Sequence, residues 1–416
     1  MTPQKSVTEA DVGGKRVLVR VDFNVPLSGA HSTDGVGGSD STRGAVVTDD
    51  TRIRAALPTI RHLVEHGARV ILVSHLGRPI AGERGAAQPE FSLSPACRAL
   101  EALLGREVKL LEGNLEHEAS VREAIEAMSD GDVVMLENIR FYPGEKNNDP
   151  EFARALASLA DLYVNDAFGT AHRAHASTAG VAEFLPAYAG LLLAREVDTL
   201  VTMLRDAPTP FIAILGGSKV SDKFGVIERL IDVVDTLLIG GGMAFTFVAA
   251  KGYDVGTSLV EPDWVEPATR MLEKAAQKDC ELLLPVDYVV ADRFAEDAAT
   301  RIVAAEEIPV DMMGLDIGPA SCELFAAKIA EAQTIFWNGP MGVFEMAPFE
   351  AGTKAVAVAV AANDEATSVI GGGDSVAALK KFGLEEQVTF ISTGGGAAMK
   401  LVEGAALPGL SALGEV

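Results

Sequence analysis

The sequence predicts an α/β protein built from two domains, each with a parallel β-sheet. The chain has 416 residues, more than a single hydrophobic core usually supports. Ten short apolar runs rich in β-branched residues recur along it, and such runs are typical of strands covered on both faces. Amphipathic segments lie between them, and strands alternating with helices predict parallel sheets with right-handed crossovers. The predicted strands are residues 16–23, 69–74, 133–137, 162–165, 211–215, 236–239, 281–284, 334–337, 367–370 and 389–392.

The segments between the strands predict helices and two irregular loops. Residues 51–66 and 149–160 have amphipathic helical patterns. No Gly- or Pro-rich linker separates the two groups of strands, so we expect the helical stretch 191–204 to join them. Residues 28–47 form an insertion rich in Gly, Ser and Asp, and 80–90 form a smaller loop.

Composition narrows the possible function classes. The formal net charge is −24, so a wide nucleic-acid interface is not expected, because phosphates would be repelled. No run approaches the ~20 apolar residues of a membrane span, and the N-terminus lacks a signal-peptide pattern, so we expect a cytoplasmic protein. The three cysteines, Cys97, Cys280 and Cys322, are too scattered for a disulfide framework or a zinc site.

Basic and amide side chains follow the first four predicted strands. Ligands bind beyond the carboxyl ends of strands in open parallel sheets, so these residues are the first candidates for a site. A solvated surface is the usual place of a single arginine, but several at strand ends of an acidic chain favour a small, multiply charged anion. The residues at these strand ends are the acidic Asp22 together with Asn24, His75, Arg78, Arg140, His172 and Arg173.

Glycine follows the later strands instead. The segments GGSK, GGGMAF, NGPMGVFE, GGGDS and TGGG come after five of them. One Gly-Gly pair is usually a plain turn, but repeated glycines at strand-to-helix turns let backbone N–H groups approach phosphates. The spacing of ILGGSKVSDK (214–223) fits neither a Walker A motif nor a dinucleotide fingerprint. We expect a helix starting near Ser218, which would place Lys219 and Lys223 on one face.

Asp374 follows the glycine triplet 371–373 directly. A carboxylate beside a phosphate site would repel the phosphate unless a cation such as Mg²⁺ bridged the carboxylate and the phosphate oxygens. Alternatively, Asp374 is the N-cap of the next helix. The sequence leaves both open, and we favour Mg²⁺. His172 and His175 have a spacing that metal ligands can have, but Arg173 lies between them and no carboxylate ligand is near, which argues against a metal.

Ten segments, in order, resemble the phosphoglycerate kinase family over nearly the whole chain. They are RVDFNVP (20–26), SHLGRP (74–79), LENIRF (136–141), NDAFGTAHRAH (165–175), ILGGSKVSDK (214–223), IGGGMAFTF (239–247), MGLDIGP (313–319), WNGPMGVFE (337–345), GGGDSV (371–376) and STGGGA (392–397).

The resemblance implies two doubly wound, Rossmann-like parallel-sheet lobes joined by a helix, with an interlobe cleft. It places a phosphoglycerate-binding lobe at 1–190, the connecting helix at 191–205, a nucleotide-binding lobe at 206–397, and a segment returning to the N-lobe at 398–416. It implies reversible transfer of the acyl phosphate of 1,3-bisphosphoglycerate to ADP, giving ATP and 3-phosphoglycerate. Mg²⁺ accompanies the nucleotide, the lobes close by hinge bending, and the protein is a monomer.

The resemblance also implies residue roles. Arg52, Lys219, Gly373 and Gly396 match catalytic positions, with Gly394–Gly396 at a backbone anion site. The substrate set is Asp22, Phe23, Asn24, Arg52, His75, Leu76, Gly77, Arg78, Arg140 and Arg173. The nucleotide set is Gly216, Lys219, Lys223, Gly241, Gly314, Glu345, Gly372, Gly373, Asp374 and Ser375, with Asp374 also at the metal.

One departure and two alternatives accompany this interpretation. The 28–47 insertion is longer than the family's usual connection, and we expect a surface excursion that leaves Arg52 in place. Another two-lobed kinase of a small carboxylated metabolite would keep the nucleotide half and change the basic residues. A non-enzymatic scaffold would predict loss of Arg52, Lys219 or Asp374, and all three are present.

Overall fold

The computed structural model describes residues 5–28, 45–83, 87–115 and 119–414. The chain divides into two compact units, Met1–Thr199 with Ala406–Val416, and Leu200–Ala405. The division falls inside helix α6 (Leu191–Asp206), the stretch expected to join the domains. The chain returns to the first unit at 406, whereas the prediction placed this point at 398. The difference arises because α13 (Gly396–Val402) packs against α7 (Phe224–Leu230) of the second unit.

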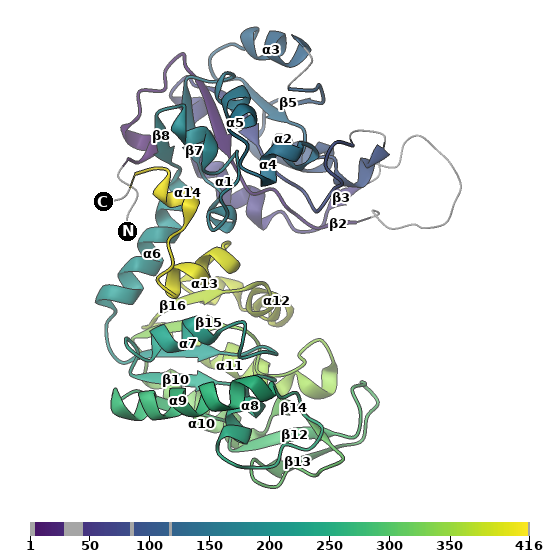
Figure 1. Ribbon diagram of the computed structural model, residues 1–416, viewed down its shortest axis with the longest axis vertical. Helices are drawn as coiled ribbons and strands as arrows, with labels where there is room; N and C mark the ends of the chain where they lie inside the picture. The colour runs from purple at the N-terminus through teal and green to yellow at the C-terminus, as the bar shows by residue number, and fades with distance from the viewer. Residues whose placement is uncertain (1–4, 29–44, 84–86, 116–118, 415–416) are drawn as a thin grey trace. The chain divides into compact units, whose positions relative to one another are not determined.

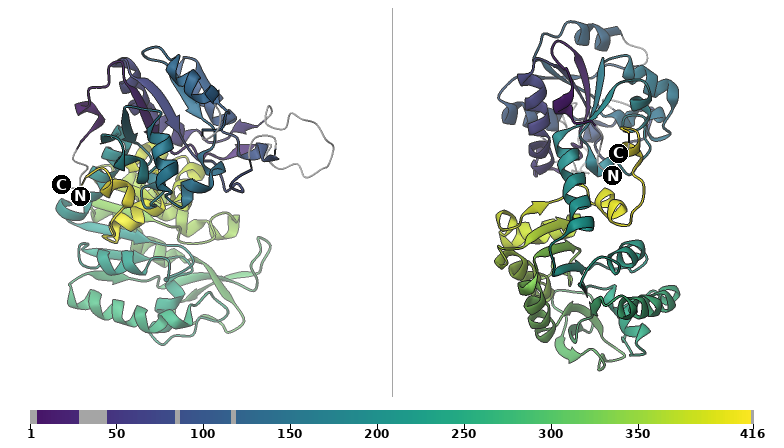
Figure 2. Two further views of the ribbon diagram at one scale, coloured as in Figure 1. Left: turned by 45° about the horizontal axis from the view of Figure 1, so that its top comes forward. Right: turned by 90° about the vertical axis from the view of Figure 1, so that its left-hand side faces the viewer.

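The first unit is built on a six-stranded sheet with the order β5-β6-β4-β1-β7-β8. Every neighbouring pair is parallel, and helices cover both faces (Figures 1 and 2). The chain starts in the middle of the sheet at β1 and later adds strands on either side of it. The carboxyl ends of the central strands therefore meet beside the point where the strand order reverses, which is where ligands bind in such sheets.

The elements of the first unit confirm the four strands and two helices predicted there. Its strands are β1 (Arg16–Arg20), β2 (Leu27–Ser28), β3 (Val46–Val47), β4 (Arg69–Val73), β5 (Val108–Leu111), β6 (Val133–Leu136), β7 (Leu162–Asn165) and β8 (Ala187–Ala189). Its helices are α1 (Thr51–Glu65), α2 (Ser94–Leu104), α3 (Ala119–Glu126), α4 (Pro143–Lys146), α5 (Pro150–Ala157) and α14 (Pro408–Ser411). Short 3₁₀ turns include η4 (Ile139–Phe141) and η5 (Phe168–Thr170).

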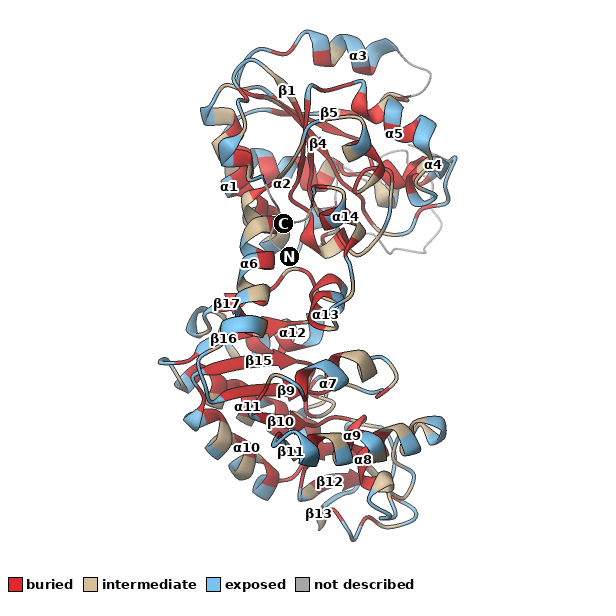
Figure 3. Cartoon of the chain, turned by 60° about the vertical axis from the view of Figure 1, so that its left-hand side comes forward, coloured by how far each residue is buried: buried red, intermediate tan, exposed pale blue. Residues whose placement is uncertain are grey.

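The second unit repeats the architecture with the strand order β11-β10-β9-β15-β16-β17. All of these pairs are parallel. Figure 3 shows α10 and α11 on one face of this sheet and α7, α8 and α9 on the other, with the buried residues concentrated in the strands. The two α/β units therefore confirm the predicted fold class of two parallel-sheet domains.

All six predicted strands of the second unit are present. They are β9 (Phe211–Leu215), β10 (Thr236–Ile239), β11 (Glu281–Leu283), β15 (Thr334–Asn338), β16 (Thr367–Gly371) and β17 (Phe390–Ile391). The remaining helices are α8 (Ala244–Ala250), α9 (Val265–Gln277), α10 (Pro319–Glu331), α11 (Ala351–Ala362) and α12 (Gly373–Phe382).

An antiparallel sheet in the second unit was not predicted. It has the order β13-β12-β14 and consists of β12 (Asp287–Ala291), β13 (Thr300–Ala304) and β14 (Met313–Ile317). Its outer strand β13 is largely exposed, so the continuous apolar runs that marked the other strands are absent there. β5 and β8, also missed, are edge strands of the first sheet, where burial on both faces is not required.

The ends of the 28–47 insertion are fixed by a short antiparallel pair. Leu27 lies opposite Val47, and Ser28 lies opposite Val46. Residues 29–44, the body of the insertion, lie outside the described residues. Among the residues that are described, no helix is long and apolar enough to cross a membrane.

Candidate active site

The first unit brings Asp22, Arg52 and His75 together from three different elements. Asp22 follows β1, Arg52 lies in the first turn of α1, and His75 follows β4. Arg52 Nη1 donates to Asp22 Oδ2 at 3.0 Å and to the Asn24 carbonyl at 3.2 Å. His75 Nδ1 lies 3.7 Å from Asp22 Oδ1. The insertion that precedes α1 therefore leaves Arg52 beside the strand-end residues, as expected.

A second set of contacts adds Asn24, Gly77 and Arg140. Asn24 Oδ1 accepts a hydrogen bond from the Gly77 N–H at 2.8 Å. Arg140, in η4 after β6, donates from Nη1 to the Gly77 carbonyl at 2.5 Å. Asn138 orients this turn, since its Oδ1 accepts from the Leu76 N–H and the Arg140 N–H at 3.2 and 3.1 Å. Asn138 was not among the predicted site residues, although it lies in the quoted LENIRF segment.

The other predicted residues of the first unit differ in how far their side chains are exposed to a ligand. Arg78 is exposed. Arg173 is half-buried and donates from Nε to His172 Nε2 at 3.1 Å. The side chains of Phe23 and Leu76 belong to the hydrophobic core, so only their backbone groups can face a ligand.

Burial and mutual repulsion perturb the basic groups of this cluster. Burial lowers the pKa of Arg140 to about 10, with further lowering by the charges of Arg173 and Arg20. The guanidinium of Arg140 thus remains charged at neutral pH. Burial, followed by four neighbouring arginines, holds the pKa of His75 well below its ordinary value. The cluster is therefore cationic through arginine, with a neutral imidazole among the charges.

In the second unit, a cavity of about 170 Å³ lies at the ends of β9, β15 and β16. Its lining includes the predicted residues Gly216, Lys219, Lys223, Gly372, Gly373, Asp374 and Ser375. Lys223 Nζ donates to the Asn338 carbonyl at 2.8 Å and also bonds the Asn338 side-chain oxygen. Burial lowers the pKa of Lys223 to about 8, while Asp374 and Asp222 oppose the shift. A half-buried ammonium in a small cavity is suited to an anionic ligand.

Two of the glycines are required by the protein's own backbone. The Gly216 N–H donates to the Asn338 carbonyl at 3.0 Å, and a Cβ on Gly216 would lie 2.0 Å from the Pro340 carbonyl oxygen. Gly372 has φ of +87°, a conformation that L-residues rarely adopt. By contrast, a Cβ on Gly373 would have no atom within 4 Å. Gly373 therefore borders open space at the start of α12.

The structure corrects two details of the sequence interpretation. Residues 218–223 form turns, and α7 begins at Phe224, so the prediction that Lys219 and Lys223 share a helix face was wrong. Lys219 is exposed at the cavity, while the Lys223 side chain reaches back to Asn338. The N-cap of α12 is Gly372. Asp374 is thus not the N-cap, which was the alternative to a metal-binding role.

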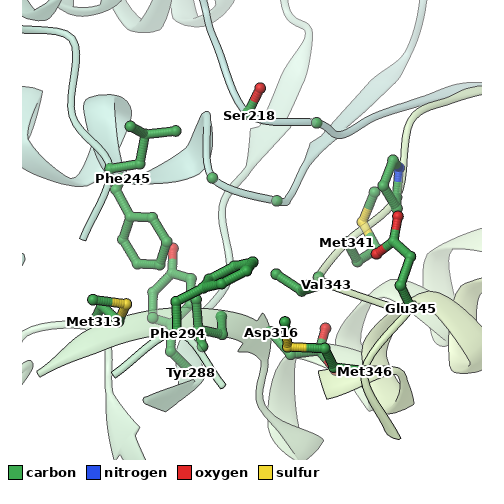
Figure 4. Close-up of a pocket in the computed structure, with 18 of the residues that line it drawn as sticks. Ser218, Phe245, Tyr288, Phe294, Met313, Asp316, Met341, Val343, Glu345 and Met346 are labelled. Atoms are coloured by element: carbon green, nitrogen blue, oxygen red, sulfur yellow. The ribbon is translucent and has the colours of Figure 1, made fainter. Parts of the chain in front are cut away.

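A second and larger cavity, of about 690 Å³, adjoins the first and shares Gly217, Ser218 and Asp374 with it. Figure 4 shows Phe245, Tyr288, Phe294 and Met313 gathered on one side, with Met341, Val343, Glu345 and Met346 on the other. The predicted residues Gly241, Gly314 and Glu345 also line it. A Cβ on Gly314 would lie 2.1 Å from the Phe245 ring. An apolar cavity next to a small polar one fits a molecule with a flat apolar end and a charged end.

The remaining predicted glycines form the turn into α13. Gly396 is the first residue of this helix, and Gly395 is its N-cap with φ of +36°. The Gly394 N–H donates to Ser392 Oγ at 3.1 Å. This turn follows β17, at the same strand-end edge as the polar cavity.

One acidic residue of the second unit, Asp374, fits a metal that is shared with a ligand. Within the described ranges, no group of three or more His, Cys, Asp or Glu side chains could hold a metal ion alone. Asp374 is exposed and lines both cavities. Mg²⁺ is commonly held by one or two carboxylates together with substrate phosphates and water, and a single carboxylate in this position fits that arrangement.

Comparisons with known proteins agree across the chain. The phosphoglycerate kinase family model matches residues 7–405. The chain belongs to the phosphoglycerate kinase family. It is 55% identical over 412 residues to phosphoglycerate kinase of Rubrobacter xylanophilus, covering 99% of this chain and 98% of that protein. It is 53% identical to the cytosolic phosphoglycerate kinase of Nicotiana tabacum, with 98% and 97% covered.

Solved structures of the family have the same fold. Phosphoglycerate kinase from Coxiella burnetii matches with a TM-score of 0.85 at 42% identity, covering 98% of both chains. The enzyme from Pyrococcus horikoshii matches with a TM-score of 0.81 at 31% identity, covering 99% of this chain and 98% of that one. The chain is accordingly a kinase of the phosphoglycerate kinase family.

Sequence reasoning missed several residues that build the two clusters. Asn338 bonds Lys223 and lines the polar cavity, and its position at the end of a predicted strand was an available signal. Arg20 gave no such signal, because it lies inside the predicted strand 16–23, although β1 itself ends at this residue. Part of the apolar lining of the larger cavity, Tyr288, Met313 and Leu315, comes from β12 and β14, which were not predicted as strands.

Proposed function

We propose that the protein reversibly transfers the acyl phosphate of 1,3-bisphosphoglycerate to ADP, giving ATP and 3-phosphoglycerate. The observation that carries this proposal is the division of chemistry between the units. The first has an arginine-rich cluster suited to a small acid phosphate, and the second has a polar and an apolar cavity suited to a nucleotide. Membership of the phosphoglycerate kinase family supports the same substrates.

In the first unit, the proposed roles follow the contacts. Asp22 and Asn24 bind the hydroxyl and carboxylate region of the glycerate, and His75, Arg78, Arg140 and Arg173 bind its anionic groups. Arg52 stabilises the transferring phosphoryl group. Its Nη1 bonds Asp22 and the Asn24 carbonyl, and these contacts hold the guanidinium beside the proposed substrate-binding residues. Backbone groups of Phe23, Leu76 and Gly77 complete this site.

In the second unit, the larger cavity takes the nucleoside, with Gly241 and Gly314 against it and Glu345 at the ribose. Gly216, Lys223 and the turn Gly372–Ser375 hold the phosphates. Asp374 would hold the Mg²⁺ that accompanies the nucleotide, and the ion would supply neutralisation of the phosphate charge. Lys219, exposed at the cavity, follows the moving phosphoryl group, and the backbone at Gly394–Gly396 supports it.

Phosphoryl transfer depends on in-line positioning and charge stabilisation more than on covalent work by the protein. The donor's leaving group is a carboxylate, so no strong general base is required, and Arg, Lys and backbone N–H groups suffice. Because the proposed ligand sites belong to different units, we infer that hinge closure precedes transfer. A fall in the radius of gyration by small-angle scattering, with both substrates bound, checks this step, and an unchanged radius would contradict it.

The proposal is tested by a coupled assay with 3-phosphoglycerate and Mg-ATP on wild type and Arg52→Ala. We expect an active wild type and a variant whose kcat is lower by about 10²-fold or more, as when one group that stabilises transition-state charge is removed. Arg54→Ala is the matched control, since Arg54 lies on the same helix and pairs with Asp50 at the surface. An inactive, correctly folded wild type would refute the substrate assignment. An unaffected Arg52→Ala variant would refute the role of Arg52.

A further inference from the structure

Three buried polar residues lie beneath the arginine cluster of the first unit and have no role in the proposed function. Arg20, at the end of β1, is 1% exposed, and Glu145 in α4 is fully buried. Arg20 Nε donates to Ser177 Oγ at 2.8 Å. Ser177 in turn donates from Oγ to Glu145 Oε1 at 2.6 Å and from its backbone N–H to Oε2 at 2.9 Å. The serine hydroxyl has one proton, so the chain of hydrogen bonds has one direction, from Arg20 to Glu145.

The other side of the Arg20 guanidinium faces His75. Arg20 Nη2 lies 3.2 Å from His75 Nδ1. A guanidinium only donates hydrogen bonds and stays protonated in proteins, so Nδ1 must be the acceptor. Asp22 Oδ1 is 3.7 Å from the same nitrogen, beyond hydrogen-bond distance, and does not compete. A ring that accepts at Nδ1 and is neutral carries its proton on Nε2.

The charged surroundings of His75 favour the neutral ring. Arg20 on β1, Arg52 on α1, Arg140 on η4 and Arg173 after η5 each lower its pKa, in addition to burial. Asp22, which follows β1, is the acidic group that faces it. Glu145 lies near the same arginines: burial raises its pKa, and the charges of Arg20 and Arg140 oppose that shift.

We propose that Arg20 is a positioning residue that fixes His75 as the neutral tautomer with its proton on Nε2. Glu145 holds Arg20 in place through Ser177. His75 then binds an anionic oxygen of the substrate as a neutral hydrogen-bond donor, and it acts neither as a cation nor as a general base. The identity of that substrate, 3-phosphoglycerate, rests on the proposed function, whereas the tautomer does not.

The tautomer is measured directly in the wild-type protein by two-bond ¹H–¹⁵N correlation spectra of the imidazole rings. The chain has only seven histidines, and His75→Gln identifies the signal of interest. The expected result is an unprotonated-type shift for Nδ1 and a protonated-type shift for Nε2, unchanged from pH 5.5 to pH 8. A protonated Nδ1, or an imidazolium ring at pH 6 to 7, would overturn the proposal. Because this measurement uses the wild-type protein, it does not depend on whether variants of Arg20, Ser177 or Glu145 fold.

Two variants test whether Arg20 and Ser177 act through His75. Arg20→Lys keeps a positive charge but lacks the planar fork that reaches both Ser177 and His75. Ser177→Ala removes the acceptor that holds Arg20. For each, we expect His75 to show a mixture of tautomers and the KM for 3-phosphoglycerate to rise about tenfold, as for loss of a charge-assisted hydrogen bond. The KM for ATP should change less than twofold.

Arg16→Lys is the matched control, since Arg16 lies on the same strand and pairs with Asp161 at a partly exposed position. It should change neither the tautomer nor the two KM values. Equal rises in both KM values for Arg20→Lys, or a raised KM with an unchanged tautomer, would overturn the positioning role. A wild type that does not use 3-phosphoglycerate would refute the proposed function and leave the tautomer result standing.

Discussion

The two units differ in the kind of group that we propose binds a ligand. In the first, the groups are charged side chains at strand ends, such as Arg52 and Arg140, held by Asp22 and by the Gly77 carbonyl. In the second, the proposed groups include the backbone at glycines of the cavity lining, with Lys223 as a half-buried cation. A charged side chain attracts a ligand electrostatically over several ångströms, so a small displacement of the ligand changes the attraction little. A backbone donor requires close approach, so that even a methyl group matters.

This difference separates two reasons for glycine in the second unit. At Gly216 the protein's own backbone fills the space, because a Cβ would meet the Pro340 carbonyl oxygen at 2.0 Å. At Gly373 the space beside the residue is open. The first glycine is therefore explained by folding, whereas we attribute the second to the nucleotide phosphates.

The largest predicted effect comes from replacing Gly373 and Gly216, each in turn, by alanine. Gly373→Ala should leave the melting temperature unchanged and weaken Mg-ADP binding by about tenfold or more, because the new methyl meets only the ligand. Gly216→Ala should lower the melting temperature by roughly 5 °C, because it forces a backbone contact apart. Thermal melts and titration calorimetry with Mg-ADP measure both. A Gly373→Ala protein that binds Mg-ADP normally would show that the turn does not face phosphates.

The fold was predictable because its signals are local and repeated. All ten predicted strands are present, and each belongs to one of the two parallel sheets. The antiparallel sheet was missed because β13 is exposed on most of its length and so lacks the apolar run that marked the others. The end of a predicted strand is also a usable landmark, which is why Asp22, His75 and Arg140 were found in the first unit.

What the sequence did not reveal depends on contacts between distant residues. Arg20 lies within the predicted strand 16–23, and its partners Ser177 and His75 are 157 and 55 residues away. Nothing in the local pattern distinguishes it from Arg16 on the same strand, whose side chain is partly exposed. The positions of Lys219 and Lys223 were misjudged for the same reason. The turn over 218–223 is held by contacts such as Lys223 with Asn338 rather than by helical propensity.

A smaller effect is expected from the half-buried ammonium of Lys223 in the polar cavity of the second unit. Burial lowers the pKa of Lys223 to about 8, so free protein loses this charge as the pH rises through 8. Binding of an anion favours the ammonium form, and Mg-ADP affinity should therefore fall roughly fivefold between pH 7.5 and 8.7. Lys223→Met should bind more weakly at pH 7.5 and lose this pH dependence. Calorimetry in buffers of different ionisation enthalpy would show proton uptake on binding above pH 8 in wild type.

The same pKa shift has a defined sign for stability. Between pH 8 and the ordinary lysine pKa of 10.5, the unfolded chain binds more protons at Lys223 than the folded protein does, so this residue makes stability rise with pH across that window. Below pH 8 the unfavourable contribution is constant. Lys223→Met should therefore be more stable than wild type at pH 7, by urea unfolding. A less stable Met variant would mean that the ammonium is well compensated by Asn338.

The smallest expected effect is a difference in salt dependence between 3-phosphoglycerate binding and Mg-ADP binding. Raising KCl from 50 to 200 mM shortens the Debye length from roughly 14 to 7 Å, which weakens the field of exposed cations such as Arg78 and partly exposed ones such as Arg52. The KM for 3-phosphoglycerate should rise about threefold. Mg-ADP binding should change less, because the apolar cavity around Phe245 and Tyr288 contributes affinity that salt does not screen. Arg78→Gln should raise the KM at low salt and flatten its salt dependence, since the most exposed of the cluster's charges is then gone. Equal salt dependence for the two ligands would show that the nucleotide, too, is bound mainly by exposed charges. The two units would then differ in the residue types that bind the ligands, but not in the physical interaction that binds them.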